Sequence, residues 1–127
     1  MSIINLSDLE HHIIQVKWFP TATPEEIAQV TADIASVIQG NQWSYFYLLV
    51  DMRAVKAFAP PSQLALVEHQ KELISLGMRR ATVVVDSAIA KSQLRRSARQ
   101  ADNEVESHWD NEEEALQFLR AQPSALN

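Results

Sequence analysis

Short apolar runs alternate with helical patterns along this 127-residue chain, and that alternation limits the fold more than any other feature. The clearest helix start is Thr23-Pro24-Glu25-Glu26, where Thr23 is a suitable N-cap, Pro24 fits the first helical position and Glu26 completes a capping box. Apolar residues then recur at helical spacing as far as Gly40, a residue type that favours the end of a helix. The sequence therefore predicts an amphipathic helix over 24–40.

Five runs have the composition of β-strands, and they lie at 3–6, 13–19, 45–50, 81–85 and 105–109. The second alternates apolar and polar residues, as a half-buried strand does, whereas the third and fourth are almost continuously apolar, as strands buried on both faces are. Further helices are predicted from Pro60 to Gly77, from Ser87 to about residue 101, and after Asn111. Strands that alternate with helices favour βαβ crossovers. We expect a single α/β domain over 1–127, with a mostly parallel four- to five-stranded sheet, four flanking helices and an N-terminal antiparallel hairpin.

Composition and charge exclude several classes of function. The chain has no cysteine, which removes disulfides, thiol catalysis and thiolate metal sites. Eleven Lys and Arg residues against sixteen Asp and Glu residues give a net charge of −5, so we expect no nucleic-acid partner. No apolar stretch has the length of a membrane span, and 1–6 lacks the pattern of a secretory signal. The expected location is the cytoplasm.

Residue types that commonly carry catalysis or bind metals form no recognisable motif here. His11 and His12 are neighbours on a strand or turn, so we expect their side chains to point to opposite faces, and His69 and His108 lack ligands at zinc-binding spacing. The sequence also lacks a Gly-x-Ser-x-Gly nucleophile motif and a Gly-x-Gly-x-x-Gly phosphate loop. We therefore expect no catalytic residue, no metal site and no cofactor.

Three segments carry a resemblance to a known family: 47–53 reads YLLVDMR, 80–85 reads RATVVV, and 110–119 reads DNEEEALQFL. Together with the Thr-Pro-Glu-Glu helix start and the helix that ends at Leu76-Gly77, they resemble the STAS and SpoIIAA-like domains over nearly the whole chain. The resemblance implies a small bacterial α/β domain whose relatives are non-enzymatic interaction modules. Some relatives are anti-anti-sigma factors switched by serine phosphorylation, and others are regulatory tails of anion transporters. The SpoIIAA-like branch is also similar to the CRAL-TRIO lipid-transfer architecture, in which an apolar ligand lies beside the sheet.

The chain departs from this family at the position where its relatives are phosphorylated. Those relatives carry an Asp-Ser-Ser/Thr-Gly motif after the strand, whereas Asp51 is followed by seven residues, 52–58, without a hydroxyl group or a glycine. The phosphoserine of the family therefore does not carry over, and we expect no phosphorylation switch of that kind.

Ligands of open parallel sheets bind beyond the carboxyl ends of the strands. The residues predicted to lie there, as a candidate ligand- or partner-binding site, are Phe19, Asp51, Met52, Arg53, Phe58, Asp86 and Ser87. A structural interpretation is that both aspartates accept backbone N–H bonds, Arg53 neutralises one of them, and Ser87 is a helix N-cap. The functional alternative is a shallow binding site, with Ser87 as a phosphorylation switch, because a phosphate group added at a helix N-terminus is favoured.

The predicted third helix carries a basic stripe, defined as Lys91, Arg95, Arg96 and Arg99. Three of these residues recur every four positions and therefore share one face. One interpretation is docking of an acidic protein or a phosphate-bearing ligand. The other is a solvated face that is balanced by the acidic residues within 104–114.

Two functional hypotheses follow. The leading one is a regulatory or protein-interaction module whose partner is a protein, a second copy in a homodimer included. Gln70, on the apolar face of the second predicted helix, would contact that second subunit unless the core satisfies it. The alternative is a carrier of a small apolar or anionic ligand beside the sheet, with Phe19, Met52 and Phe58 at the mouth and Arg53 or the basic stripe holding an anionic group. A carrier needs a closed apolar cavity of roughly several hundred Å³, and an interaction module needs a filled core and an exposed apolar patch. A third possibility, an enzyme that uses Asp51, Arg53 and Asp86, needs a carboxylate of strongly perturbed pKa in a cleft.

Overall fold

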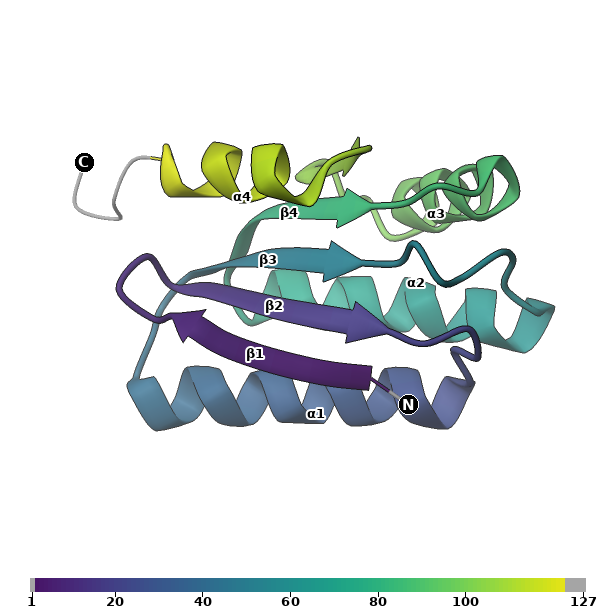
Figure 1. Cartoon of the computed structure of the whole chain (residues 1–127). Helices are drawn as coiled ribbons and strands as arrows, with labels where there is room; N and C mark the ends of the chain where they lie inside the picture. The colour runs from purple at the N-terminus through teal and green to yellow at the C-terminus, as the bar shows by residue number, and fades with distance from the viewer. Residues whose placement is uncertain (1, 123–127) are drawn as a thin grey trace.

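The computed structural model describes residues 2–122, which form a five-stranded sheet and four helices (Figure 1). In chain order the elements are β1 (Ser2–Asp8), β2 (Ile13–Trp18), α1 (Pro24–Asn41), β3 (Phe46–Asp51), α2 (Pro60–Ser75), β4 (Met78–Val84), α3 (Ala88–Gln100), β5 (Glu106–Trp109) and α4 (Glu112–Arg120). The strands lie side by side in the order β1-β2-β3-β4-β5, with β1 antiparallel to β2 and the other neighbours parallel. The predicted mostly parallel sheet with four helices and an N-terminal hairpin is therefore confirmed.

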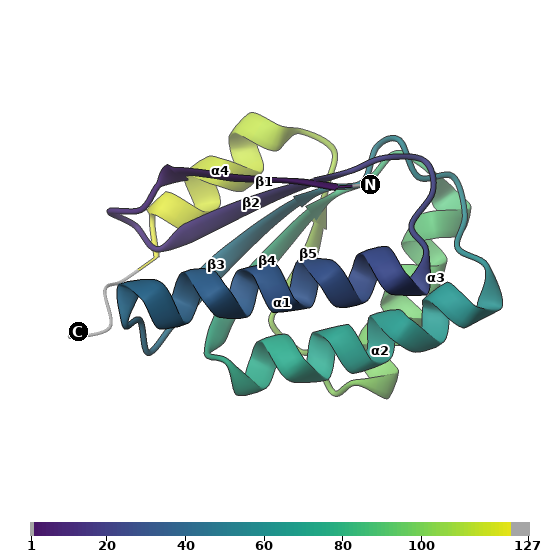
Figure 2. The ribbon, with the colours of Figure 1, turned by 90° about the horizontal axis from the view of Figure 1, so that it is seen from below.

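The helices cover the two faces of the sheet unequally (Figures 1 and 2). Helices α1, α2 and α3 pack against one face, around the larger apolar core. Helix α4 packs against the other face, where the smaller core consists of Ile13, Tyr47, Leu49, Val84, Ala115 and Leu119. Strand β3 is consequently buried along its whole length, as its continuous apolar run predicts. Among residues 2–122, none of the helices combines the length and the apolarity that crossing a bilayer requires.

The two glycines of the chain play different parts at the ends of helices. The Thr23 capping box forms as predicted, with the Glu26 backbone N–H donating to Thr23 Oγ1 over 3.2 Å. The predicted end at Gly40 is wrong, because α1 continues to Asn41 and Gln42 adopts the left-handed conformation at φ +56°. Gly77 does end its segment as predicted: it has φ +107° and forms the sharp turn between α2 and β4.

The register of the parallel strands aligns their carboxyl ends along one edge of the sheet, which we call the carboxyl edge. Lys17 of β2 is paired with Asp51 of β3, and Asp51 is paired with Val84 of β4. The loop 52–59 and the N-terminal ends of α2 and α3 follow these strands directly. The predicted site residues therefore lie at one end of the molecule, beyond the carboxyl ends of β2, β3 and β4.

Candidate functional site

An ion-pair network joins the end of β3 to the start of α4. Arg53 donates from Nε to Asp51 Oδ1 over 2.9 Å and from one terminal nitrogen to Asp51 Oδ2 over 2.8 Å. The same terminal nitrogen is 2.8 Å from Glu112 Oε2, and the Arg53 backbone N–H donates to Asp51 Oδ1 over 3.1 Å. Asp51 is therefore engaged on both carboxylate oxygens, as the structural interpretation of the sequence holds.

Asp51 and Arg53 hold each other in their charged forms. Hydrogen bonds from the Arg53 side chain are the main reason that the pKa of Asp51 lies below its ordinary value of 3.8, although burial opposes the shift. Hydrogen bonding to Asp51 likewise raises the pKa of Arg53. A carboxylate held in its charged form by a bidentate guanidinium is suited to structure and poorly suited to proton transfer, which needs a pKa near the working pH.

The apolar residues predicted to form a ligand mouth are largely part of the core. Met52 and Phe58 are both only 4% exposed and belong to the larger core, and Phe19 is half-buried. The cavity that Met52 borders measures about 30 Å³, far less than the roughly several hundred Å³ that a carrier needs. Its polar lining includes Gln70, which accepts a hydrogen bond from Asn103 over 3.4 Å and is satisfied within the core.

Side chains from α3 fix the loop 52–59. Ser87 is the N-cap of α3, because its Oγ accepts from the Ala90 backbone N–H over 3.2 Å, and the same hydroxyl donates to the Lys56 carbonyl over 2.6 Å. The Gln93 amide bonds both backbone groups of Phe58, accepting from its N–H over 2.7 Å and donating to its carbonyl over 2.9 Å. The loop is thus held in one position against the start of α3.

The remaining polar groups near this edge differ in accessibility. Asp86 is exposed and contributes to the elevated pKa of Arg53 through its charge. Ser62, in the first turn of α2, is only 4% exposed and donates its hydroxyl proton to the Ala22 carbonyl over 2.6 Å. The serine at the start of α2 is therefore enclosed, whereas Ser87 at the start of α3 is half-buried.

Exposed apolar side chains lie close to this edge, and sequence analysis did not single them out. Leu64 in the second turn of α2 is 70% exposed, and Ile89 at the start of α3 is 64% exposed. Between the two helices lies a groove of about 380 Å³, lined by Gln63, Ala88, Ile89, Ser92, Gln93 and Arg96. We call this region the α2–α3 surface. Helical spacing gave no clear signal for this exposure, because Leu64 precedes the buried Val67 by three residues, a spacing that also fits the buried face.

The basic stripe lies on the solvent side of α3, whose sheet-facing residues are Ala90, Leu94 and Ser97. Lys91 comes no closer than 3.9 Å to Asp110, whose side chain is 94% exposed. Arg95, Arg96 and Arg99 are exposed, and none of them has a hydrogen-bond or ion-pair partner among residues 2–122. Among residues 2–122, the only ion pair between the basic stripe and the acidic residues within 104–114 is therefore that of Lys91 with Asp110.

His11 and His12 are adjacent in the turn between β1 and β2, whereas His69 lies on α2 and His108 on β5. Within the described residues no group of three or more His, Asp or Glu side chains is arranged to hold a metal ion. His11 and His108 each bond a nearby carboxylate, of Asp8 and Glu106 respectively, and His69 bonds Thr31 between α1 and α2.

Comparison with known proteins identifies the fold. The chain matches no protein-family model and no curated protein sequence. Among solved structures it is similar to the anti-sigma factor antagonist SpoIIAA in its unphosphorylated form, with a TM-score of 0.68 and 12% identity over 98% of this chain and 100% of that one. It is also similar to the NMR structure of the protein TM1081, with a TM-score of 0.60 and 12% identity over 94% of this chain and 88% of that one.

The architecture places the chain among small α/β domains with one helix on the far face of a mostly parallel sheet. Within that class it has the SpoIIAA-like, or STAS, fold, and the resemblance seen in the sequence is confirmed at the level of the fold. Identity of 12% carries no residue roles across, so the function has to be argued from this chain's own surfaces.

Proposed function

We propose that this SpoIIAA-like domain is a non-enzymatic regulatory module that binds a partner protein at its α2–α3 surface. The observation that carries the proposal is the exposure of two large apolar side chains near the starts of α2 and α3: Ile89, which is 64% exposed and lines the groove, and Leu64 in the second turn of α2, which is 70% exposed. Exposed apolar side chains beside polar and charged groups are typical of protein-binding surfaces. Arg96 lines the groove without a partner in residues 2–122, and it favours an acidic group on the bound protein.

The rigidity of the neighbouring backbone supports this function. The bonds of Ser87 to Lys56 and of Gln93 to Phe58 hold the loop 52–59 in place before any partner arrives. A surface that is already ordered loses little conformational entropy on binding. The loop contributes two further exposed residues at this end, Lys56 and Ala57.

The similarity to the anti-sigma factor antagonist SpoIIAA gives the proposal its regulatory sense, because an antagonist of an anti-sigma factor acts on another protein. We do not extend phosphorylation control to this chain at the start of α2. Residues 52–58 carry no hydroxyl group, and Ser62 is enclosed with its hydroxyl already bonded to Ala22. These residues therefore support regulation by partner binding without phosphorylation at this position.

The test compares the partners that wild type and variants recover from cells of the native host. We expect a specific protein to bind wild type, to be lost with L64E/I89E, and to be retained with the control I74E, which changes a less exposed residue at the other end of α2. Binding should then be reproduced with the purified partner. Recovery that is equal for all three proteins would contradict the α2–α3 surface.

Native mass spectrometry of freshly purified protein tests the carrier alternative. The buried positions of Met52 and Phe58 and the small volume of the cavity beside Met52 favour a chain that binds no small molecule there. We expect the mass of the protein alone. A bound small molecule lost on denaturation would overturn the proposal in favour of a carrier.

A further inference from the structure

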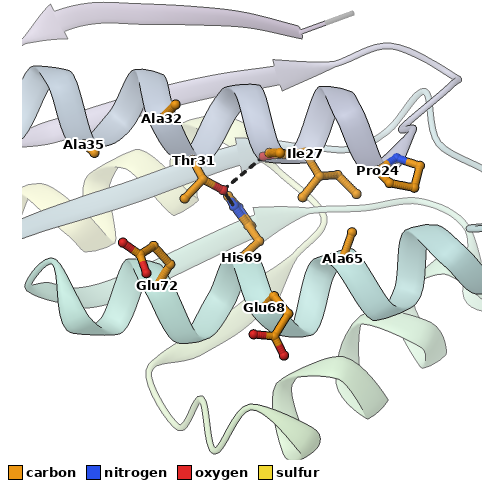
Figure 3. A pocket seen from close by; sticks show the side chains of 10 residues that line it. Pro24, Ile27, Thr31, Ala32, Ala35, Ala65, Glu68, His69 and Glu72 are labelled. Atoms are coloured by element: carbon orange, nitrogen blue, oxygen red, sulfur yellow. Dashed lines mark hydrogen bonds between the residues drawn. The ribbon is translucent and has the colours of Figure 1, made fainter.

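A groove of about 440 Å³ opens to solvent between α1 and α2, apart from the α2–α3 surface (Figure 3). Three small side chains, Ala28, Ala32 and Ala35, line its α1 side together with Pro24, Ile27 and Thr31, while Glu68 and Glu72 stand on its α2 side. Small side chains let a second helix approach closely, toward the lower end of the usual interaxial distances of about 8–10 Å. The groove therefore has the shape for a helix, with carboxylates along one wall.

The two helices that form this groove carry more acidic than basic residues. Helix α1 contains no Lys or Arg, and α2 contains only Lys71, which is 3.7 Å from Glu68. Glu68 and Glu72 are four residues apart, so they stand one turn apart on the same face of α2. A helix that fits this groove should present cations at the same spacing.

Helix α3 has that pattern. Lys91, Arg95 and Arg99 recur every four residues on its solvent side, and neither Arg95 nor Arg99 has a partner in the described part of the chain. The acidic groove and this basic face cannot meet within one molecule, because α2 lies between α1 and α3 (Figure 2). Each molecule thus carries both halves of a complementary pair on different sides.

We propose that the α1–α2 groove of one copy binds α3 of a second copy, with Arg95 and Arg99 opposite Glu68 and Glu72. Because the two surfaces are different, the contact is head-to-tail and leaves a free groove and a free α3 on every growing assembly. This self-association uses side chains other than Leu64 and Ile89, which carry the partner surface proposed above. Its charged contacts are exposed, so salt should weaken it strongly: the Debye length falls from about 10 Å at 0.1 M to about 3 Å at 1 M.

Sedimentation velocity on the full chain tests the contact with two neutralised variants. Wild type should form larger species as its concentration rises at low salt, and return to monomer in about 1 M salt. E68Q/E72Q and R95Q/R99Q should each associate at least about tenfold more weakly, since each removes two opposed charges. Mixed together they should form a one-to-one dimer that grows no further, because one intact groove meets one intact α3.

The control is E113Q/E114Q, which neutralises two exposed carboxylates on α4 and should associate like wild type. Circular dichroism establishes that each variant is folded. Wild type that stays monomeric at every concentration in low salt would overturn the proposal, as would folded variants whose mixture forms no dimer. The result is separable from the partner test, because L64E/I89E should still self-associate and E68Q/E72Q should still recover the partner protein.

Discussion

At the scale of single residues, His69 is a buried side chain that stays uncharged because it is buried. Thr31 donates its only hydroxyl proton to the Ile27 carbonyl over 3.0 Å, so its Oγ1 must accept from His69 Nδ1, which is 2.6 Å away. His69 is 9% exposed, and burial lowers its pKa to about 4 from an ordinary 6.5. The ring is therefore uncharged at neutral pH and links α1 to α2 through its Nδ1 proton.

We predict that this histidine makes the domain less stable as the pH falls from 7 to 5. The unfolded chain takes up a proton at the ordinary pKa of 6.5, whereas the folded chain resists protonation down to about 4, so stability is lost across that window. The loss should be about 2 kcal/mol in urea unfolding between pH 7 and 5. In H69N, which keeps a donor near Nδ1, this loss should largely disappear. Equal pH profiles for the two proteins would contradict the buried neutral ring.

We predict a clear difference between the two carboxylates that contact Arg53. D51N should lower the free energy of unfolding by about 1–3 kcal/mol, because it breaks a bidentate pair whose acidic side chain is only 12% exposed. E112Q changes a contact in which both side chains are more than 40% exposed, and should cost at most about 1 kcal/mol. Urea unfolding at pH 7 measures both. An equal cost would mean that burial does not set the strength of this network.

At the scale of elements, the two glycines offer a matched pair of substitutions. G77A should destabilise by more than about 1 kcal/mol, because φ is +107° and an added Cβ would lie 2.4 Å from the Ser44 carbonyl oxygen. G40A should stabilise by about 0.5–1 kcal/mol, because Gly40 lies within α1 and a Cβ there meets no atom within 4 Å. Thermal unfolding should show opposite shifts. A G40A variant less stable than wild type would contradict the helical assignment of residue 40.

Sequence patterns predicted the elements well because local chemistry marks where most of them begin. The Thr23 capping box, the prolines at the start of α2 and the Ser87 cap of α3 all appear where the sequence places them. The end of α1 was wrong, since a glycine that fits a helix end also fits a helix interior. The left-handed Gln42 and the hydrogen bond from the Trp43 N–H to the Ile38 carbonyl end the helix after Asn41 instead.

The candidate site was less predictable than the elements. Sequence order places Met52 and Phe58 just after a strand, but it does not say that both side chains turn inward and join the core. The pairing of Asp51 with Arg53 is local and was expected, whereas the contact of Arg53 with Glu112 spans 59 positions and depends on where α4 packs. The exposure of Leu64 and Ile89 likewise depends on how α2 and α3 pack against their neighbours.

At the scale of the whole molecule, stability should fall from the centre of the sheet toward β5. Strand β3 is wholly buried and paired on both sides, whereas β5 has four half-buried residues and pairs with β4 alone. In native-state hydrogen exchange we expect amides of β3 to exchange only on global unfolding, and those of β5 at least about tenfold faster. Equal protection of the two strands would show that the sheet opens as one unit.

The strictly sequential order of the strands also bears on how the chain emerges during synthesis. Each strand adds beside the one made just before it, so a growing chain can extend its sheet without waiting for a distant segment. The cover for one face arrives late, because α4 follows all five strands. Until then Tyr47, Leu49 and Val84 lack the helix that buries them in the finished molecule. A nascent chain of this protein therefore offers molecular chaperones an apolar sheet surface that closes only with its last helix.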